Sequence, residues 1–593
     1  MSAPTTRFHW VAVVAAGLVA IQLGIRAVVA FEGYFYWDDL ILVGRAGTQP
    51  ILSADYLFAD HDGHVMPGAF LIAGVITRLA PLDWLWPAVS LVILQLVASL
   101  ALLRALHVIL GWRPALLIPL TFALFTPLGL PAFSWWAAGL NALPMLAAMT
   151  WFCADAIQLV RTGRRRYLAT AVVALVGGLV FFEKAAVIPF VGFVIAAVLT
   201  HVTASDAVSI VWRQAKTLWI ASLGVIAAWV ALYLVVVDQR RWSTDLSMTG
   251  ELLLRSFTHG IVPGLVGGPW SWQRWAPASP WAVPPTTVMV LGWAALAAVV
   301  ALSFRLKRRI GWVWAVAFAY AVACQVPIYL MRSSAFTALE LAQTLRYLAD
   351  LVVVLALYMA IAITAPDRQP VTTASLPRVV AVVATAAVTA SSVYSTLTYL
   401  TVWRDNPAEQ YLRNAERSLA EAHRGSSAPL LDQEVDPLVL QRVAYPENLA
   451  SHMFALLKDR PDFAAYTTDL RMLDNSGRLF PALVTWTRSI APGPEPGCGY
   501  LIQPGRSVTM RLDGPLLPAD WTAEINYLAN SDGSLTMSLD DGTATRFPVR
   551  PGLNRVFVRL AGAGDAVTVE ANTAALSVCI AAGPVGFLAI APR

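Results

Sequence analysis

The chain has 593 residues, of which 57% are hydrophobic and only 13% are charged, and its formal net charge is +5. Soluble globular proteins carry roughly 25% charged residues, so this composition excludes that class. The cations lie in short clusters between apolar runs, which argues against nucleic acid as a partner. Apolar runs of about 20 residues recur along the chain, and that length predicts a polytopic α-helical membrane protein embedded in a lipid bilayer.

The first apolar run, 8–30, predicts a transmembrane helix, because it is too long for the hydrophobic region of a cleavable signal peptide. Just beyond its outer end lies the acidic pair Asp38-Asp39, beside aromatic residues such as Trp37 that favour the membrane interface. A carboxylate at this depth can meet both a lipid-borne and a water-soluble substrate. The pair is therefore the first candidate site. The alternative is that one aspartate caps a loop helix.

The first loop, 31–83, also contains the segment Asp60-His61-Asp62-Gly63-His64. Three interpretations of His61 and His64 stay open: ligands of zinc or another divalent cation, contacts to an acceptor or to the aspartates, or parts of a structural turn around Gly63. The following stretch, 68–80, is apolar but too short to span, which predicts a helix lying at the interface.

The remaining spans bring the predicted total to about eleven. They are 84–110, 114–130, 135–158, 167–182, 184–202, 217–237, 284–304, 311–330, 346–365 and 377–401. The clusters of Lys and Arg between spans all fall on one side, which the positive-inside rule identifies as the cytoplasm. The sequence thus predicts a multi-pass protein of the plasma (inner) membrane with a cytoplasmic N-terminus. The acidic pair and everything after 401 are then extracytoplasmic.

Several ionisable residues lie at the predicted outer ends of spans. Glu183-Lys184 interrupts an apolar stretch, Arg332 closes the ninth span, and Arg346-Tyr347 opens the tenth. Outward cations run against the positive-inside trend, and arginine can grip a phosphate bidentately. The alternatives are a self-paired Glu183-Lys184 and snorkelling of each arginine to lipid headgroups. The tryptophans of the loop 238–283 favour interfacial anchoring over sugar stacking.

The composition changes after Trp403. Residues 405–425 predict a polar amphipathic helix, and 403–490 a mixed α/β linker region. From 491 to 593, alternating segments broken by turn residues predict a β-sandwich or jelly roll. The predicted strands are Ser507–Leu512, Thr522–Tyr527, Ser534–Leu539, Arg555–Leu560 and Ala566–Glu570. Cys498 and Cys579 bracket this region on the side where disulfides persist, and we expect them to pair.

An acidic motif directly after the first span, a polytopic domain and a terminal extracytoplasmic domain together resemble the GT-C class of glycosyltransferases. The resemblance implies a transmembrane catalytic domain over 1–402, with a C-terminal β-domain that is a candidate for binding carbohydrate. It also implies a polyprenyl-phosphate-linked sugar donor and a glycan or glycolipid acceptor. Within the class, the Ala/Val/Arg-rich composition is most similar to the actinobacterial cell-envelope branch, which transfers arabinofuranose or mannose from decaprenyl phosphate.

This chemistry assigns expected roles to the candidates. A sugar hydroxyl loses a proton as it attacks the anomeric carbon, so we expect Asp38 to be the general base and Asp39 to orient the acceptor, hold a cation or exchange roles with Asp38. A lipid phosphate leaves readily, so no general acid is required, unlike in glycoside hydrolysis. The phosphate needs cationic partners. Expected donor-phosphate ligands are Lys184, Arg332 and Arg346, and expected substrate contacts are Trp37, His61, His64, Glu183 and Tyr347. No metal ligand set is assigned, although a divalent cation stays open.

Two other functions compete with this one. A lipid-linked glycan transporter or flippase predicts paired repeats and broken helices near the midplane, whereas the acidic pair lies at the rim. A non-catalytic envelope scaffold that binds glycan does not require the acidic pair, the outward arginines and Lys184 to converge. A cytoplasmic nucleotide-sugar enzyme is disfavoured, because the inner loops are short and carry no phosphate-binding glycine motif.

Overall fold

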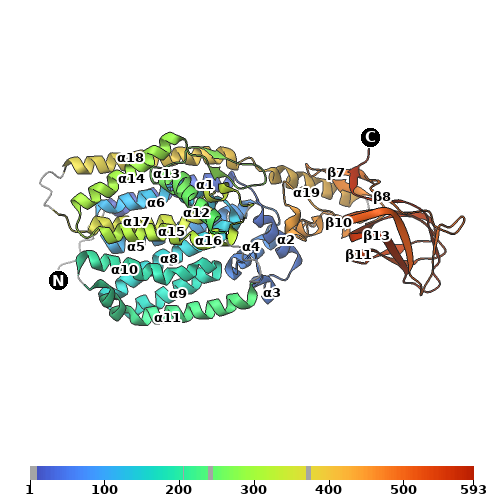
Figure 1. The fold of residues 1–593 in the computed structure, drawn as a ribbon, viewed down its shortest axis with the longest axis horizontal. Coiled ribbons are helices and arrows are strands. Elements are labelled where there is room, and N and C mark those ends of the chain that lie inside the picture. Colours follow the sequence, from blue (N-terminus) through green and yellow to red (C-terminus); the bar gives the residue numbers. More distant parts are fainter. Residues whose placement is uncertain are drawn as a thin grey trace. The chain divides into compact units, whose positions relative to one another are not determined.

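The computed structural model describes residues 10–204, 206–237, 245–334, 336–368, 375–425 and 427–592. The first residues of the predicted span 8–30 and of the loop 238–283 lie outside this part. The chain forms two compact units (Figure 1). The first comprises Met1–Leu42 and Gln49–Asn406, and the second comprises Val43–Thr48 and Pro407–Arg593.

The first unit is a bundle of apolar helices. Within the described residues, nine helices are long and apolar enough to cross a membrane, or ten if the pair Pro114–Phe125 and Pro127–Ser134, bent by 42°, is one span. Their helices are α1 (Trp10–Phe31), α5 (Leu85–Leu110), α8 (Trp136–Thr162), α10 (Ile188–Thr203), α11 (Ala207–Val236), α14 (Thr286–Leu306), α15 (Gly311–Ala323) with α16 (Val326–Arg332), α17 (Ala349–Thr364) and α18 (Ser375–Trp403). The bent pair comprises α6 (Leu117–Phe125) and α7 (Leu130–Ser134), each preceded by a short 3₁₀ turn.

The predicted count of about eleven spans is not confirmed. It includes the bent pair and also α9 (Arg165–Phe181), which has 17 residues and so lies at the lower limit of spanning length, ~17–25 residues. Every predicted span is helical in the part that the structure describes. The predicted and observed counts differ only because α9 is short and the pair α6 and α7 is bent.

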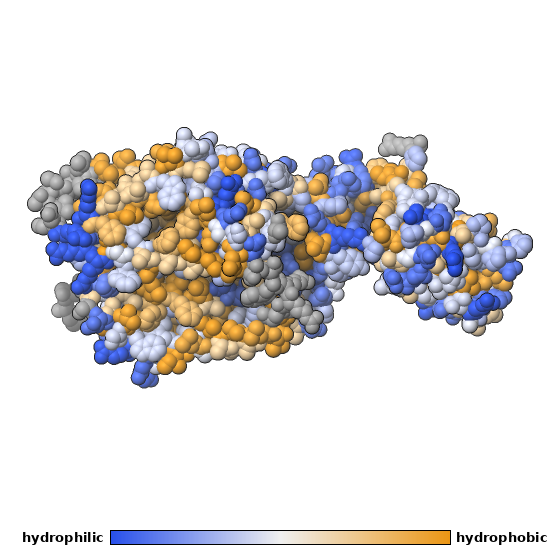
Figure 2. All heavy atoms as spheres, viewed as in Figure 1, coloured by the Kyte–Doolittle hydropathy of each residue, from blue (hydrophilic) through white to orange (hydrophobic). Residues whose placement is uncertain are grey.

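On the face seen in Figure 2, apolar residues, drawn in orange, make up much of the surface of this unit. On α14, for example, Val290, Leu291, Val299 and Leu302 are all exposed. Soluble proteins rarely expose apolar patches larger than a few hundred Å², and a surface of this kind instead faces lipid. The chain is thus a multi-pass α-helical membrane protein.

The loops of this unit contain ordered elements that position the candidate site. The first loop holds α2 (Asp38–Thr48), α3 (Ala54–Leu57) and α4 (Pro67–Leu79). The predicted helix 68–80 corresponds to α4, and its place at the interface stays a prediction. In the Trp-rich loop, the indole N–H groups of Trp270 and Trp272 donate to Ser391 Oγ (2.7 Å) and the Ser395 carbonyl (3.0 Å) of α18. These two rings therefore pack against a helix of their own bundle.

The second unit begins with the predicted amphipathic helix, α19 (Pro407–Gly425), followed by short strands and turns. Its main feature is a nine-stranded sheet in which β10 (Val508–Ala529) and β13 (Gly552–Ala571) pair antiparallel along their lengths. The other long strands are β11 (Gly533–Gly542) and β12 (Thr545–Val549), and short strands at the edges include β9 (Tyr500–Ile502) and β14 (Val578–Ile580).

The prediction of separate short strands is wrong in two places. Ser507–Leu512 and Thr522–Tyr527 are parts of β10, and Arg555–Leu560 and Ala566–Glu570 are parts of β13. Turn-type residues between the predicted strands interrupt the alternation of apolar and polar residues. In the structure the strand continues through them, and the pairing shifts register near Leu516. Both halves of each long strand contribute to one apolar core, so the C-terminal region is β-rich, and its division into the two sheets of a sandwich stays a prediction.

Cysteines occupy two different settings. Cys498 and Cys579 form a disulfide with an S–S distance of 2.04 Å, which is the pairing that the sequence predicts. The bond ties the segment before β9 to β14. Cys153 and Cys324 are buried free thiols in the helical unit.

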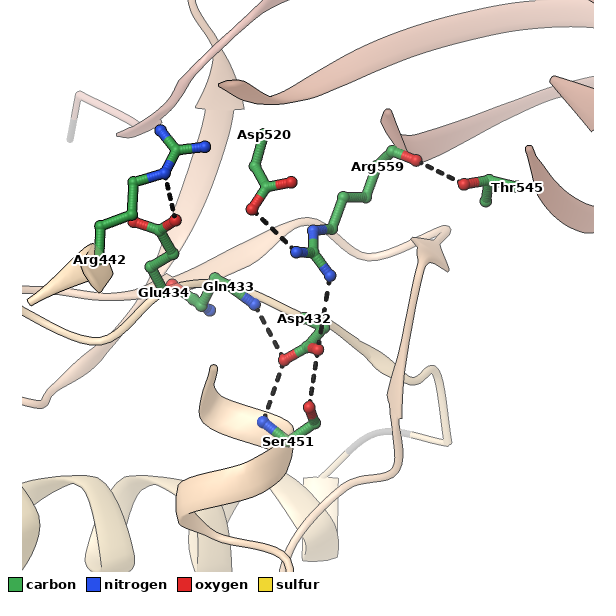
Figure 3. Close-up of polar contacts among 8 residues, drawn as sticks. All are labelled: Asp432, Gln433, Glu434, Arg442, Ser451, Asp520, Thr545 and Arg559. Atoms are coloured by element: carbon green, nitrogen blue, oxygen red, sulfur yellow. Dashed lines mark hydrogen bonds and ion pairs between the residues drawn. The ribbon is translucent and has the colours of Figure 1, made fainter. Parts of the chain in front are cut away.

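An arginine at the centre of the second unit joins the sheet to the segment that precedes it (Figure 3). Arg559 of β13 lies 2.9 Å from Asp520 of β10 and 3.6 Å from Asp432. Asp432 in turn accepts hydrogen bonds from the backbone and hydroxyl of Ser451, at 3.0 and 2.7 Å. Because all three charged side chains are less than 20% exposed, with 14% for Arg559, this contact is screened less than a surface ion pair.

We predict that Arg559→Met destabilises the second unit by about 2–4 kcal/mol, because it leaves two partly buried carboxylates without their cation. Arg555→Met is the matched control on the same strand, since Arg555 is 57% exposed in its pair with Glu524. The control should change stability by less than about 0.5 kcal/mol. Hydrogen exchange of the β10 and β13 amides measures both effects in the full chain, and equal protection in the two variants would contradict the assignment.

Candidate active site

Asp39 is fully buried and fixes the first loop to the helical bundle. Its Oδ2 accepts the backbone N–H of Tyr36 at 2.9 Å, and its Oδ1 accepts the backbone N–H of Ala137 at 2.8 Å. Ala137 lies in the first turn of α8, where free N–H groups and the helix dipole favour a negative charge. Burial raises the pKa of Asp39 well above its usual range, against the opposing effect of these two hydrogen bonds. Both carboxylate oxygens are thus occupied, which suits a positioning residue.

Asp38 is the first residue of α2, and its carboxylate is held by fewer contacts than that of Asp39. The preceding residue, Trp37, has a φ of 44°, a strained value for a bulky side chain, and its carbonyl accepts the Leu40 N–H at 2.9 Å to begin the helix. The Asp38 side chain is 23% exposed, and His61 Nε2 lies 3.9 Å from its Oδ1. The predicted substrate contact of Trp37 stays a prediction, while its backbone helps to aim Asp38.

The electrostatic surroundings of Asp38 bring several predicted residues together. Burial raises the pKa of Asp38 to about 6, while Arg346, His64 and Arg332 lower it and Asp62 raises it. Arg346, His64 and Arg332 therefore all lower the pKa of this one carboxylate, although they come from segments far apart in the sequence. Nearby Tyr36 is buried as well, and burial raises its pKa to about 12.

The histidines lie in a tight turn. The backbones of His61 and His64 exchange two hydrogen bonds of 3.1 and 3.0 Å, and Asp62 and Gly63 between them both have positive φ, 52° and 86°. This is the structural turn that the sequence left open. The turn also presents side chains, because His64 Nδ1 lies 2.7 Å from Glu183. Burial lowers the pKa of His64, but the charge and hydrogen bond of Glu183, together with the charge of Asp38, raise it, and the net direction is upward.

Glu183 and Lys184 do not pair with each other, so the self-paired alternative is wrong. Lys184 Nζ lies 2.8 Å from Asp350 at the start of α17 and donates at 3.4 Å to the Tyr347 carbonyl. Asp350 also accepts the Tyr320 hydroxyl at 2.6 Å. The two adjacent charges are thus held by different elements, Glu183 by the first loop and Lys184 by α17.

Arg346 makes cation–π contacts with two aromatic rings. Its guanidinium lies 4.9 Å from the ring centres of both Trp135 and Tyr347, and its Nη2 donates to the Tyr347 hydroxyl at 2.7 Å. Its buried Nε has no hydrogen-bond partner among the described residues. Arg332, which is exposed, lies 5.8 Å from the same Tyr347 ring. Arg346 does not extend to lipid headgroups, as the snorkelling alternative requires, because its guanidinium is half-buried and stacks on two rings. The ring of Tyr347 contacts both Arg346 and Arg332.

Two residues of this arrangement were not predicted. Asp350 follows the Arg346-Tyr347 pair by one helical turn and is an acid within an apolar span, a signal that the sequence does contain. Trp135 sits among many tryptophans and carries no distinguishing signal. None of the His, Cys, Asp and Glu side chains in the described ranges gather in threes that could hold a metal ion.

Comparison with known proteins gives structural neighbours only. A scan against protein-family models finds no match, and a search of curated proteins finds none. Among solved structures, ArnT from Cupriavidus metallidurans bound to undecaprenyl phosphate is 13% identical with a TM-score of 0.45, covering 76% of this chain and 85% of that one. Arabinofuranosyltransferase AftD from Mycobacteria is 13% identical with a TM-score of 0.34, covering 97% and 59%. The Archaeoglobus fulgidus oligosaccharyltransferase, in complex with Zn and sulfate, is 14% identical with a TM-score of 0.35, covering 69% and 55%.

These neighbours are GT-C glycosyltransferases, the class that the sequence resembles. Their identities are near 13% and their TM-scores are below 0.5, so the function of this chain rests on the side chains of its own site.

We predict that Asp39→Asn lowers the stability of the helical unit by about 1–3 kcal/mol, because the new amide group cannot accept the second backbone N–H. Asp38→Asn is the matched control one residue away and should change stability by less than about 0.5 kcal/mol. Thermal unfolding of the purified full chain in detergent measures both. A larger loss for Asp38→Asn than for Asp39→Asn would reverse the roles assigned here.

Proposed function

We propose that the protein is a membrane glycosyltransferase that moves a sugar from a polyprenyl-phosphate donor to a glycan or glycolipid acceptor on the extracytoplasmic face. The observation that carries the proposal is the setting of Asp38. Its partly exposed carboxylate interacts with Arg346 and Arg332, and within the described residues neither arginine forms an ion pair with an acid. A base and unneutralised cations in one place suit the transfer of a sugar away from a phosphate.

The reaction uses the two aspartates differently. The hydroxyl oxygen of the acceptor bonds to the anomeric carbon of the donor sugar, and Asp38 takes the proton of that hydroxyl. At the same time, the bond between the anomeric carbon and the phosphate oxygen breaks. The lipid phosphate leaves with the bonding electrons, and the arginines stabilise its added charge. A pKa of about 6 leaves Asp38 ionised yet basic near neutral pH, as general-base catalysis favours. Asp39 holds the loop in place through its two backbone contacts.

The cations are not equivalent as donor ligands. Lys184 is already paired with Asp350, so a phosphate must compete with that carboxylate for it. We therefore assign the phosphate first to Arg346 and Arg332, and keep Lys184 as a third ligand. His61, His64, Glu183, Tyr347 and Trp37 are proposed to contact the sugars.

The finer assignments belong to the same proposal. We propose arabinofuranose or mannose as the sugar and an actinobacterial cell-envelope glycan as the acceptor. The chain is proposed to lie in the plasma membrane with its N-terminus cytoplasmic, and to be divided into a catalytic domain (1–402), a linker region (403–490) and a β-domain (491–593). Compared with a transporter, the transferase is supported by the clustering of charged partners around one carboxylate in the first loop.

We predict that Asp38→Asn lowers kcat for sugar transfer by about 10²–10⁴-fold, because the amide cannot accept the proton. The assay supplies polyprenyl-phosphate mannose and polyprenyl-phosphate arabinofuranose in separate reactions with an oligosaccharide acceptor. Asp55→Asn is the control, since Asp55 is an exposed acid of the same loop. Turnover of Asp38→Asn equal to that of Asp55→Asn with an active donor contradicts the catalytic role, and no transfer by the wild type with either donor contradicts the substrate class.

The pH profile tests the electrostatic setting. Because the reactive form of Asp38 is the carboxylate and its pKa is raised to about 6, kcat/KM should fall as the pH drops through about 6. Arg346 lowers this pKa, so Arg346→Gln should move the acidic limb to higher pH, whereas Arg346→Lys should keep it near the wild-type position. A limb that stays in place in Arg346→Gln would show that another group titrates.

A further inference from the structure

A second cationic site lies inside the helical bundle. Arg26 of α1 is 6% exposed and lies within a candidate membrane span. Its guanidinium faces the Phe133 ring at 5.1 Å, and its buried Nη1 has no hydrogen-bond partner among the described residues. No acid in that part of the chain forms an ion pair with it. A permanent charge buried without a counter-charge is strongly unfavourable, and ionisable residues inside a membrane domain mark binding sites.

Arg26 lines a cavity of about 50 Å³. One wall is polar and comes from α1 and α5: Gln22, Arg26, Gln95 and Ser99. The rest of the lining is apolar and consists of Ala98, Leu102, Ala123, Leu124, Gly129, Ala132, Ala142, Leu143, Leu146, Ala349, Val352 and Val353. A single water occupies roughly 10–15 Å³ on this measure, so the space admits more than one water or a small ion.

The polar wall is directional. Gln95 Nε2 donates to Ser99 Oγ at 3.1 Å, and Ser99 Oγ donates to Gln22 Oε1 at 3.3 Å. This chain of donors ends at Gln22, whose side-chain nitrogen makes no hydrogen bond to a described residue. The cavity is thus lined by a guanidinium and an amide whose N–H groups lack acceptors among the described residues, and its lining contains no carboxylate.

We propose that this cavity binds a small inorganic monovalent anion of the halide class, held by Arg26 and the Gln22 amide. The anion supplies the counter-charge that the bundle itself does not give Arg26. A lipid phosphate fits the observations less well. The lining residues of α8, which are Ala142, Leu143 and Leu146, lie 5 to 9 positions beyond Ala137 of the acidic site, roughly 8–14 Å along the helix, and the lining outside the polar wall is apolar. The proposal does not depend on the sugar-transfer function.

The test is a bromide titration of the full chain in detergent, with gluconate holding the ionic strength constant. We expect a saturable rise of about 2 °C or more in the unfolding temperature of the wild type, because a ligand that binds only the folded state stabilises it. Arg26→Gln should abolish the rise. Arg305→Gln, which removes an exposed arginine from the end of α14, should retain it. A rise of the same size in Arg26→Gln and the wild type identifies a general salt effect and overturns the proposal.

Ala142→Leu is a second variant for the case that Arg26→Gln does not fold. It keeps Arg26 and adds a larger side chain at an apolar lining position, so the bromide response should be lost or shifted to at least tenfold higher concentration. Undecaprenyl phosphate serves as the competing ligand. Stabilisation by this lipid, but not by bromide, that disappears in either variant assigns the cavity to a lipid phosphate and overturns the halide site.

Discussion

The carboxylate of Asp39 is the contact on which the candidate site depends. It accepts one backbone N–H from the loop that follows α1 and another from the first turn of α8. These two bonds join segments that are about a hundred residues apart in sequence, a loop on one side and the start of a helix on the other. Because the N-terminus of a helix presents unpaired N–H groups, a buried acid can be accommodated there. The oxygen atoms of the neighbouring Asp38 accept no backbone hydrogen bond from any residue that the structure describes.

Around this contact, several charged residues have a partner from a different element. The first loop reaches Glu183 through His64, the segment after α9 reaches α17 through Lys184 and Asp350, and Arg346 lies between Trp135 and Tyr347. Such interlocked pairs fix relative positions even where the energy of a single pair is small. The site is thus built by long-range contacts among loop and helix-end residues, on a bundle held together mainly by apolar packing.

Much of this arrangement could be predicted from the sequence. Apolar length predicts the spans, and an acid pair or a Lys after an apolar stretch is conspicuous because charge is rare there. The partners could not be predicted, since pairing depends on which helix ends meet in space. Glu183 and Lys184 are adjacent and of opposite charge, yet each is held elsewhere. The sequence divides β10 at Gly514 and Pro515 and β13 at Gly562 and Gly564, because such residues signal a turn, but here they lie where the register shifts between two continuous strands.

The turn at His61 to His64 has a consequence for how this region can vary. Surface loops usually tolerate insertions, but here two residues with positive φ connect a pair of hydrogen-bonded histidines whose rings approach different acids, Asp38 and Glu183. In an antiparallel pair, successive side chains point to opposite faces, so a length change of one residue turns one ring away from its acid. Natural variants of this chain should therefore change the turn by substitution and keep its length, even where the loop on either side grows or shrinks.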